Sequence, residues 1–119
     1  MLARANRLTA SADFTETVRK GRRAHVGALT GFLLTSVNET GSGTEAKQPP
    51  RFGFQVSRRV GGSVDRHRVV RQLRHLIAPW VAKTPHSTMV VIRPDRKSSD
   101  YEVDVDLLMR RLTENEAKQ

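Results

Sequence analysis

Seven arginines and one acidic residue, Asp65, lie between positions 51 and 74. The arginines are Arg51, Arg58, Arg59, Arg66, Arg68, Arg71 and Arg74. Guanidinium groups form bidentate hydrogen bonds with phosphate, and their positive charges repel one another unless an anion neutralises them. A solvated helix face usually mixes both signs of charge at i,i+4 spacing. The segment therefore predicts contact with a phosphate-rich polyanion, and the alternative is a charged face that only aids solubility.

The turn in the middle of this segment, Gly61-Gly62-Ser63, adds a second phosphate-binding feature. The glycines permit a tight turn, and Ser63 can cap the helix that follows. Free backbone N–H groups at a helix N-terminus attract phosphate. The alternative is that the glycines only allow the chain to bend from strand to helix.

Other residue types give no sign of catalysis. The chain has no cysteine, which excludes thiolate chemistry and zinc–cysteine sites. His67 and His75 are eight residues apart, roughly 80° around a helix, which is poor geometry for a shared metal. The acids between positions 100 and 106 are read as helix caps and solvated charges rather than as a metal site. We predict no catalytic residue and no metal ligand in the protein.

Two aromatic residues near the basic segment could stack on single-stranded bases. They are Phe14 and Phe54, and a stacked base contributes roughly 1–3 kcal/mol. Aromatics make up only 5% of the chain, so both rings could instead be needed in the hydrophobic core. A core position is favoured for Phe54, and both interpretations stay open for Phe14.

Composition limits the possible partners. The chain has 119 residues, a net charge of +9 and a pI of about 11.2, which indicates nucleic acid, an anionic membrane surface or an acidic protein as partner. No apolar run is long enough to span a membrane, and the first residues lack the pattern of a signal peptide. We expect a cytoplasmic protein without a membrane partner.

The elements that must position these residues follow from periodicity and turn signals. We expect a helix from Ser11 to Gly21, one or two strands within 22–37, a strand over 51–57, a helix over 64–82, a strand over 88–93 and a helix over 104–117. This order, α-β-β-β-α-β-α, predicts an α+β two-layer sandwich with the helices on one face of a mostly antiparallel sheet. We expect residues 1–119 to form a single domain, which the charge assigns to RNA binding, with a flexible loop at 38–50 and mobile ends at 1–9 and 114–119.

The helix over 64–82 is the strongest prediction. Its apolar residues form one arc: Val69, Val70, Leu73, Leu76, Ile77, Trp80 and Val81. The adjoining face is basic: His67, Arg68, Arg71, Arg74 and His75. Pro79 must lie in the last turn or kink it.

The segment 51–74, RFGFQVSRRVGGSVDRHRVVRQLR, resembles the signature of the protein subunit of bacterial ribonuclease P. The matching positions are Gly53, Ser57, Arg58, Arg59, Gly61, Val64, Arg66, Arg68, Arg71 and Arg74. Arg7-Leu8, Asp13-Phe14 and Gly21 match further upstream, so the resemblance covers nearly the whole chain. Four residues depart from the family pattern: Val18, Gly62, His67 and Val70.

The resemblance implies a protein cofactor of a ribozyme. The RNA subunit, with Mg²⁺ that it mainly holds, would hydrolyse precursor tRNA to release the 5′ leader, and no obligate protein partner is implied. Residues Arg59, Arg66, His67, Arg68, Arg71 and Arg74 would contact the catalytic RNA. A cleft near Phe14, Val18, Phe54 and Arg58 would hold the leader. The implied fold is the ribosomal-protein-S5-domain-2-like fold with a left-handed βαβ crossover. The alternatives are a ribosomal or other structural RNA-binding protein and a self-sufficient nuclease using the acids around Asp104.

Overall fold

The computed structural model describes residues 2–35 and 48–117, with side chains described as far as Thr113. In chain order the elements are η1 (Arg4–Asn6), α1 (Ser11–Lys20), β1 (Arg22–Val26), β2 (Leu29–Thr35), β3 (Arg51–Phe54), α2 (Ser63–Ile77), η2 (Ala78–Trp80), β4 (Thr88–Pro94) and α3 (Tyr101–Ala117). The expected order of helices and strands is confirmed, with two strands in the region after Gly21.

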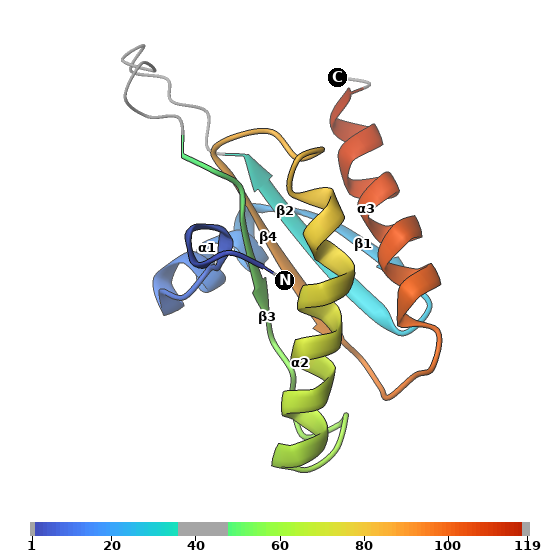
Figure 1. Cartoon of the computed structure of the whole chain (residues 1–119). Helices are drawn as coiled ribbons and strands as arrows, with labels where there is room; N and C mark the ends of the chain where they lie inside the picture. The colour runs from blue at the N-terminus through green and yellow to red at the C-terminus, as the bar shows by residue number, and fades with distance from the viewer. Residues whose placement is uncertain (1, 36–47, 118–119) are drawn as a thin grey trace.

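The four strands form one mixed sheet in the order β1-β2-β4-β3. The β1–β2 and β2–β4 pairs are antiparallel, and only β3 and β4 are parallel. In Figure 1 the chain runs down β3, returns upward through α2 in front of the sheet, and runs down β4 to the right of β3. This sense makes the β3-α2-β4 crossover left-handed, as the family resemblance implied and against the usual rule.

The core has a part on each face of the sheet. The larger part joins Leu33, Val90 and Ile92 to apolar residues of α2 and α3. On the other face, Phe32 and Val91 pack against α1. The two-layer arrangement of sheet and helices holds for α2 and α3, but the expectation that all helices share one face is wrong for α1. Phe14 and Val18 of α1 pack against the apolar residues on this second face of the sheet.

α1 and α2 begin within one residue of the expected positions, but α2 ends at Ile77, before the expected position 82. Gly21 ends α1, where its N–H donates to the Thr17 carbonyl. The expected capping role of Ser63 is wrong, because Gly62 is the N-cap of α2 and no side chain caps that end. Pro79 occupies η2, where the chain tightens from α to 3-10 geometry after Ile77.

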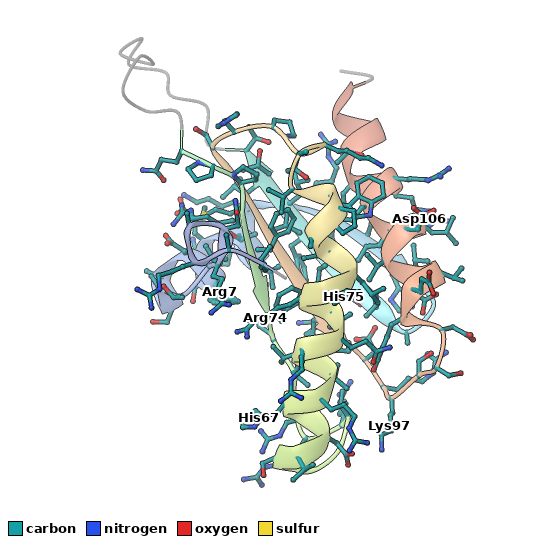
Figure 2. All side chains as sticks on the ribbon, viewed as in Figure 1. Arg7, His67, Arg74, His75, Lys97 and Asp106 are labelled. Atoms are coloured by element: carbon teal, nitrogen blue, oxygen red, sulfur yellow. The ribbon has the colours of Figure 1, made fainter. Side chains whose placement is uncertain are left out.

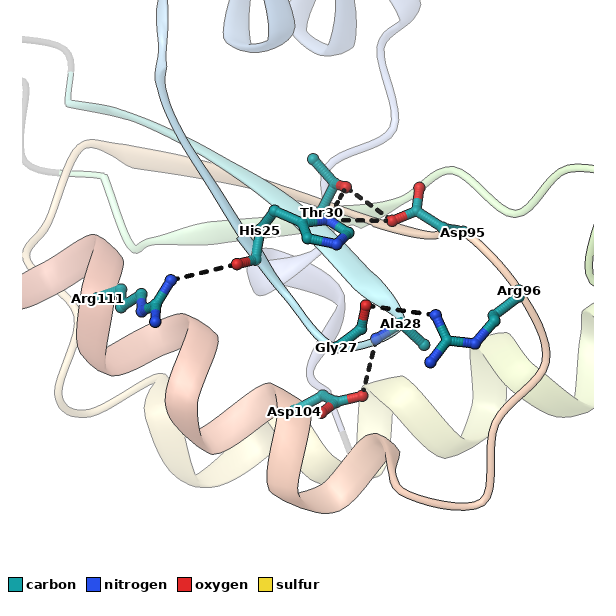
Figure 3. A network of polar contacts seen from close by, with 8 residues as sticks. All are labelled: His25, Gly27, Ala28, Thr30, Asp95, Arg96, Asp104 and Arg111. Carbon is teal, nitrogen blue, oxygen red and sulfur yellow. Dashed lines mark hydrogen bonds and ion pairs between the residues drawn. The ribbon is translucent and has the colours of Figure 1, made fainter.

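The β1–β2 hairpin is fastened to the start of α3 (Figure 3). The buried carboxylate of Asp104 accepts a hydrogen bond of 3.1 Å from the N–H of Ala28 in the hairpin turn. α3 begins three residues earlier than expected, at Tyr101, whose buried hydroxyl donates to the Arg96 carbonyl at 2.7 Å. Burial raises the pKa of Tyr101, so the phenol stays protonated and keeps this bond.

The chain ends and the long loop were expected to be mobile. Leu2 and Leu8 are buried, and the Leu8 N–H donates to the Phe52 carbonyl at 2.9 Å. The mobility of 1–9 stays a prediction. Most of the loop at 38–50 lies outside the described residues, as do the last two residues of the chain. Across the described ranges, none of the helices has the length and apolar character needed to cross a bilayer.

Candidate nucleic-acid interface

The positive charges of the α2 arginines are not paired with any acid that the structure describes. Arg68 and Arg71 are exposed, and Arg66 and Arg74 are half-buried. Within the described residues, no acid forms an ion pair with these four or with Arg58 and Arg59. The one acid of the segment, Asp65, pairs instead with Lys97 at 3.3 Å. An exposed electropositive surface is therefore present, as the spacing predicted. Of the seven arginines, Arg51 alone forms an ion pair with a described acid, Asp13, at 3.2 Å.

The side of α2 that faces β3 is hollowed into a groove of about 660 Å³. Its lining residues are Phe54, His67, Val70, Arg71, Arg74 and His75. Figure 2 shows His67 and Arg74 on this side of α2, while Lys97 and Asp106 lie on the opposite side. The basic face and the edge of the sheet thus enclose a concave surface with an apolar floor and a cationic rim.

Phe14 and Phe54, expected in one cleft, lie on opposite faces of β3. Phe14 touches the backbone of Gly53, where an added Cβ would come 2.4 Å from its ring. Phe54 follows Gly53 in the strand and therefore points the other way, against the core under α2 and α3. Val18 accompanies Phe14 on the α1 face. The structure brings Phe14 and Val18 together and separates them from Phe54.

One basic residue on the α1 face was missed from the sequence. Arg93 ends the buried run of β4, and its guanidinium lies 5.3 Å from the centre of the Phe32 ring. A hollow of about 350 Å³ beside it is lined by Arg93, Arg59 and Ser57, together with Pro94 and Asp95. The signal was available: Arg93 continues the alternation of Met89 and Val91, which places it on their face of the sheet.

In the turn before α2, the first glycine, Gly61, is required by the backbone conformation and by the lack of space for a side chain. Gly61 has a φ of +145°, and a Cβ there would approach the Asp65 carboxylate to 2.6 Å. Gly62 has no neighbour within 4 Å of such a Cβ, so the open side of the turn is at Gly62. Arg58 and Arg59, which precede it, are exposed and are held by the turn hydrogen bonds Val60 N–H to Ser57 and Gly61 N–H to Arg58.

The acids near α3 do not converge on a common site. Asp104 accepts the hydrogen bond from Ala28 of the β1–β2 hairpin, and Asp106 pairs with Arg110 at 3.1 Å. No group of three histidine or acidic side chains suited to a metal ion occurs in the described part of the chain. The described acids therefore do not form the convergent cluster of carboxylates that a two-metal nuclease site needs.

Comparison with known proteins decides between the RNA-binding alternatives. The family model for ribonuclease P matches residues 2–114. The chain belongs to the ribonuclease P protein family. The ribonuclease P protein component of Streptomyces avermitilis is 38% identical over 117 residues, covering 94% of this chain and 95% of that protein. The component from Nocardioides sp. is 43% identical over 110 residues, covering 90% and 89%.

Solved structures of ribonuclease P proteins share the fold. The Staphylococcus aureus protein superposes with a TM-score of 0.72 at 14% identity, covering 89% of this chain and 94% of that one. The Thermotoga maritima protein gives 0.59 at 17% identity, covering 92% of each chain. Family membership makes this chain the protein subunit of a ribonucleoprotein endoribonuclease that processes the 5′ end of tRNA.

Proposed function

We propose that the acid-free arginine surface of α2 binds the catalytic RNA of ribonuclease P, while the α1 face of the sheet receives the 5′ leader of precursor tRNA. The residues proposed for the catalytic RNA are Arg59, Arg66, His67, Arg68, Arg71 and Arg74. The observation that carries this proposal is the lack of acidic partners for these arginines among the described residues. The chain would work in the cytoplasm with two RNA partners and no obligate protein partner.

The physical role of this surface is charge neutralisation. Each guanidinium that contacts a phosphate releases condensed counterions, so binding is favoured by entropy and weakens as salt rises. Catalytic RNA and precursor tRNA are both polyanions, and a cationic protein between them lowers their mutual repulsion. We propose that Mg²⁺ is held mainly by the RNA and that the protein lowers the Mg²⁺ concentration needed for cleavage.

The leader side is proposed around Phe14 and Val18, with Arg58 in the turn beyond β3. Both apolar side chains are half-buried and pack on the Phe32–Val91 surface, so each keeps an exposed edge. Arg93 lies along the same side near the end of β4, where its guanidinium is placed to contact leader phosphates. Phe54 lies on the other face of the sheet, where it lines the groove beside α2, and is therefore not proposed to contact the leader.

The proposed function is tested by reconstituted cleavage. Precursor tRNA, catalytic RNA and low-millimolar Mg²⁺ are combined with and without the protein, and mature tRNA is measured over time. We expect the protein to raise both cleavage and substrate affinity. Unchanged cleavage and unchanged affinity would reject the proposal, and cleavage by protein alone would point to a nuclease instead.

Phe14→Ala should selectively weaken the binding of substrates that carry a long leader. Loss of a stacked base costs about 1–3 kcal/mol, which is roughly a 5- to 150-fold loss of affinity. A leaderless substrate should bind as it does to the unchanged protein. Binding is measured for both substrates with the assembled ribonucleoprotein.

The control is Phe14→Leu, which keeps most of the apolar volume against Gly53 and removes the ring. It should reproduce the loss on long leaders if stacking is the cause. Equal losses for long-leader and leaderless substrates would show instead that Phe14 only supports the packing of α1.

A further inference from the structure

The groove between β3 and α2 continues toward the start of the helix. A second hollow of about 230 Å³ adjoins the first and shares Phe54, His67 and Val70 with it. Val56, Ser63 and Arg66 complete its lining. The larger hollow alone, at about 660 Å³, falls within the roughly 300–1,000 Å³ of typical small-molecule sites.

Two arginines that line this groove each have a buried donor without a partner among the described residues. The Nε atoms of Arg66 and Arg74 are buried and make no hydrogen bond to any described residue. Arg66 lines the smaller hollow and Arg74 the larger one. A buried donor left unsatisfied is unfavourable, more so when it carries charge. No acid among the described residues lines either hollow, so the guanidinium charges of Arg66 and Arg74 are not neutralised at the groove and favour an anionic ligand.

The floor of the groove distinguishes a nucleotide from a bare phosphate or a duplex. Phe54 and Val56 of the β3 side and Val70 of α2 are half-buried, so they keep apolar surface toward the groove. Bases inside an A-form helix are stacked on one another and offer proteins mainly their backbone, whereas unpaired bases stack on aromatic side chains. An aromatic floor with arginines around it therefore matches an unpaired nucleotide.

We propose that this groove receives an unpaired nucleotide of the catalytic RNA, with its base against Phe54 and its phosphates on Arg66 and Arg74. The inference rests on the proposed function, because it takes α2 as the surface for the catalytic RNA. The leader is assigned to the other face of the sheet, where Phe14 and Val18 lie. Single-stranded RNA is thus bound at two separate places, one on each face.

The first test introduces Phe54→Leu into the full chain that already carries Phe14→Ala, so that the leader face is weakened equally in both proteins compared. It uses two probes, a single-stranded RNA oligomer and a duplex of the same length. Single-strand affinity should fall about 5- to 150-fold, the equivalent of 1–3 kcal/mol for one stacked base. Duplex affinity should change less than about twofold. Phe54→Tyr, which keeps an aromatic ring, should restore single-strand binding. Equal losses on both probes, or no loss on either, would overturn the proposal.

Arg68→Ala is the matched control on the same helix, because Arg68 is exposed and lines neither hollow. It should weaken both probes by a similar factor through lost charge alone, with a salt slope shallower by about one unit or slightly less. If Arg68→Ala weakened single-strand binding but not duplex binding, the nucleotide would have to bind near Arg68 and not in the groove, which would contradict the proposal.

A fluorescence measurement tests the groove without relying on a weakened variant. The chain has one tryptophan, Trp80, so Trp80→Phe combined with Phe54→Trp leaves a single tryptophan in the groove. Single-stranded RNA should quench its emission, and a duplex at equal phosphate concentration should not. Quenching by neither probe, or equally by both, would contradict the proposal.

The last arm separates the catalytic RNA from the leader. Phe54→Leu should weaken binding of the protein to the catalytic RNA with no substrate present. A defect seen only with long-leader substrates would place the leader in the groove and overturn the assignment. The reconstituted cleavage assay with the unchanged protein reports on the proposed function itself, so the two failures can be told apart.

Discussion

Changing Arg66, Arg71 and Arg74 together to Gln should lower affinity for the catalytic RNA by about 10²- to 10³-fold at moderate salt. The estimate takes about 1–1.5 kcal/mol for each lost charged contact with phosphate. The slope of log affinity against log salt should become shallower by about two to three units, because each phosphate contact contributes roughly 0.7–0.9. Affinity is measured by filter binding across a salt series.

The matched control changes the same three residues to Lys. It keeps the charge and so should keep most of the salt slope, while the loss of the planar fork removes bidentate contacts and weakens binding more modestly. A Gln variant with an unchanged slope would show that these arginines do not contact phosphate. Thermal unfolding of both variants checks that the fold is retained, since the Nε atoms of Arg66 and Arg74 are buried.

The arginine surface could be predicted because its causes are local. Val69, Leu73 and Ile77 recur every four residues and are buried, which fixes the orientation of α2. The basic residues must then face away from the core. Whether acids from elsewhere neutralise them is a tertiary question. Among the described residues no acid pairs with them, and the acid of α2 itself, Asp65, pairs with Lys97 from the loop after β4.

The placement of Phe54 in one cleft with Phe14 is the part of the sequence reasoning that the structure contradicts. Alternation along β3 puts Phe52 and Phe54 on one face of the strand, as observed. Nothing local states which face α1 covers. Gly53 decides it, because the missing side chain leaves space that the Phe14 ring fills. A glycine inside a strand often marks such a close approach, so this signal was present in the sequence without its partner being known.

Asp104 illustrates the same limit for polar residues. The sequence suggested an acid near the start of a solvated helix, whereas the side chain is buried and bonded to Ala28, 76 residues away. Periodicity finds apolar faces well, but a long-range bond between a carboxylate and a turn has no local signature. The left-handed crossover is likewise beyond periodicity and was expected only from the family resemblance.

Gly27→Ala should produce the largest loss of stability of any single change considered. Gly27 has a φ of +57° at the first central position of the two-residue β1–β2 turn, where glycine is favoured. A Cβ there would lie 2.3 Å from a carboxylate oxygen of buried Asp104. Backbone strain of about 1–2 kcal/mol adds to the loss of the Ala28–Asp104 bond, about 1–3 kcal/mol. We expect the free energy of unfolding to fall by about 3 kcal/mol in urea titration, a large part of the stability of an ordinary domain.

Two comparisons isolate the cause. Gly62→Ala makes the same chemical change where φ is −74° and no atom lies within 4 Å of the new Cβ, so it should shift stability by less than about 1 kcal/mol. Asp104→Ala alone leaves the Ala28 N–H unsatisfied, yet combined with Gly27→Ala it also removes the steric conflict. The double variant should therefore be more stable than the sum of the single losses predicts. If the losses in unfolding free energy of the two single variants were strictly additive, the turn and α3 would not be coupled through the Asp104 carboxylate. The attachment of the hairpin to α3 would then need another explanation.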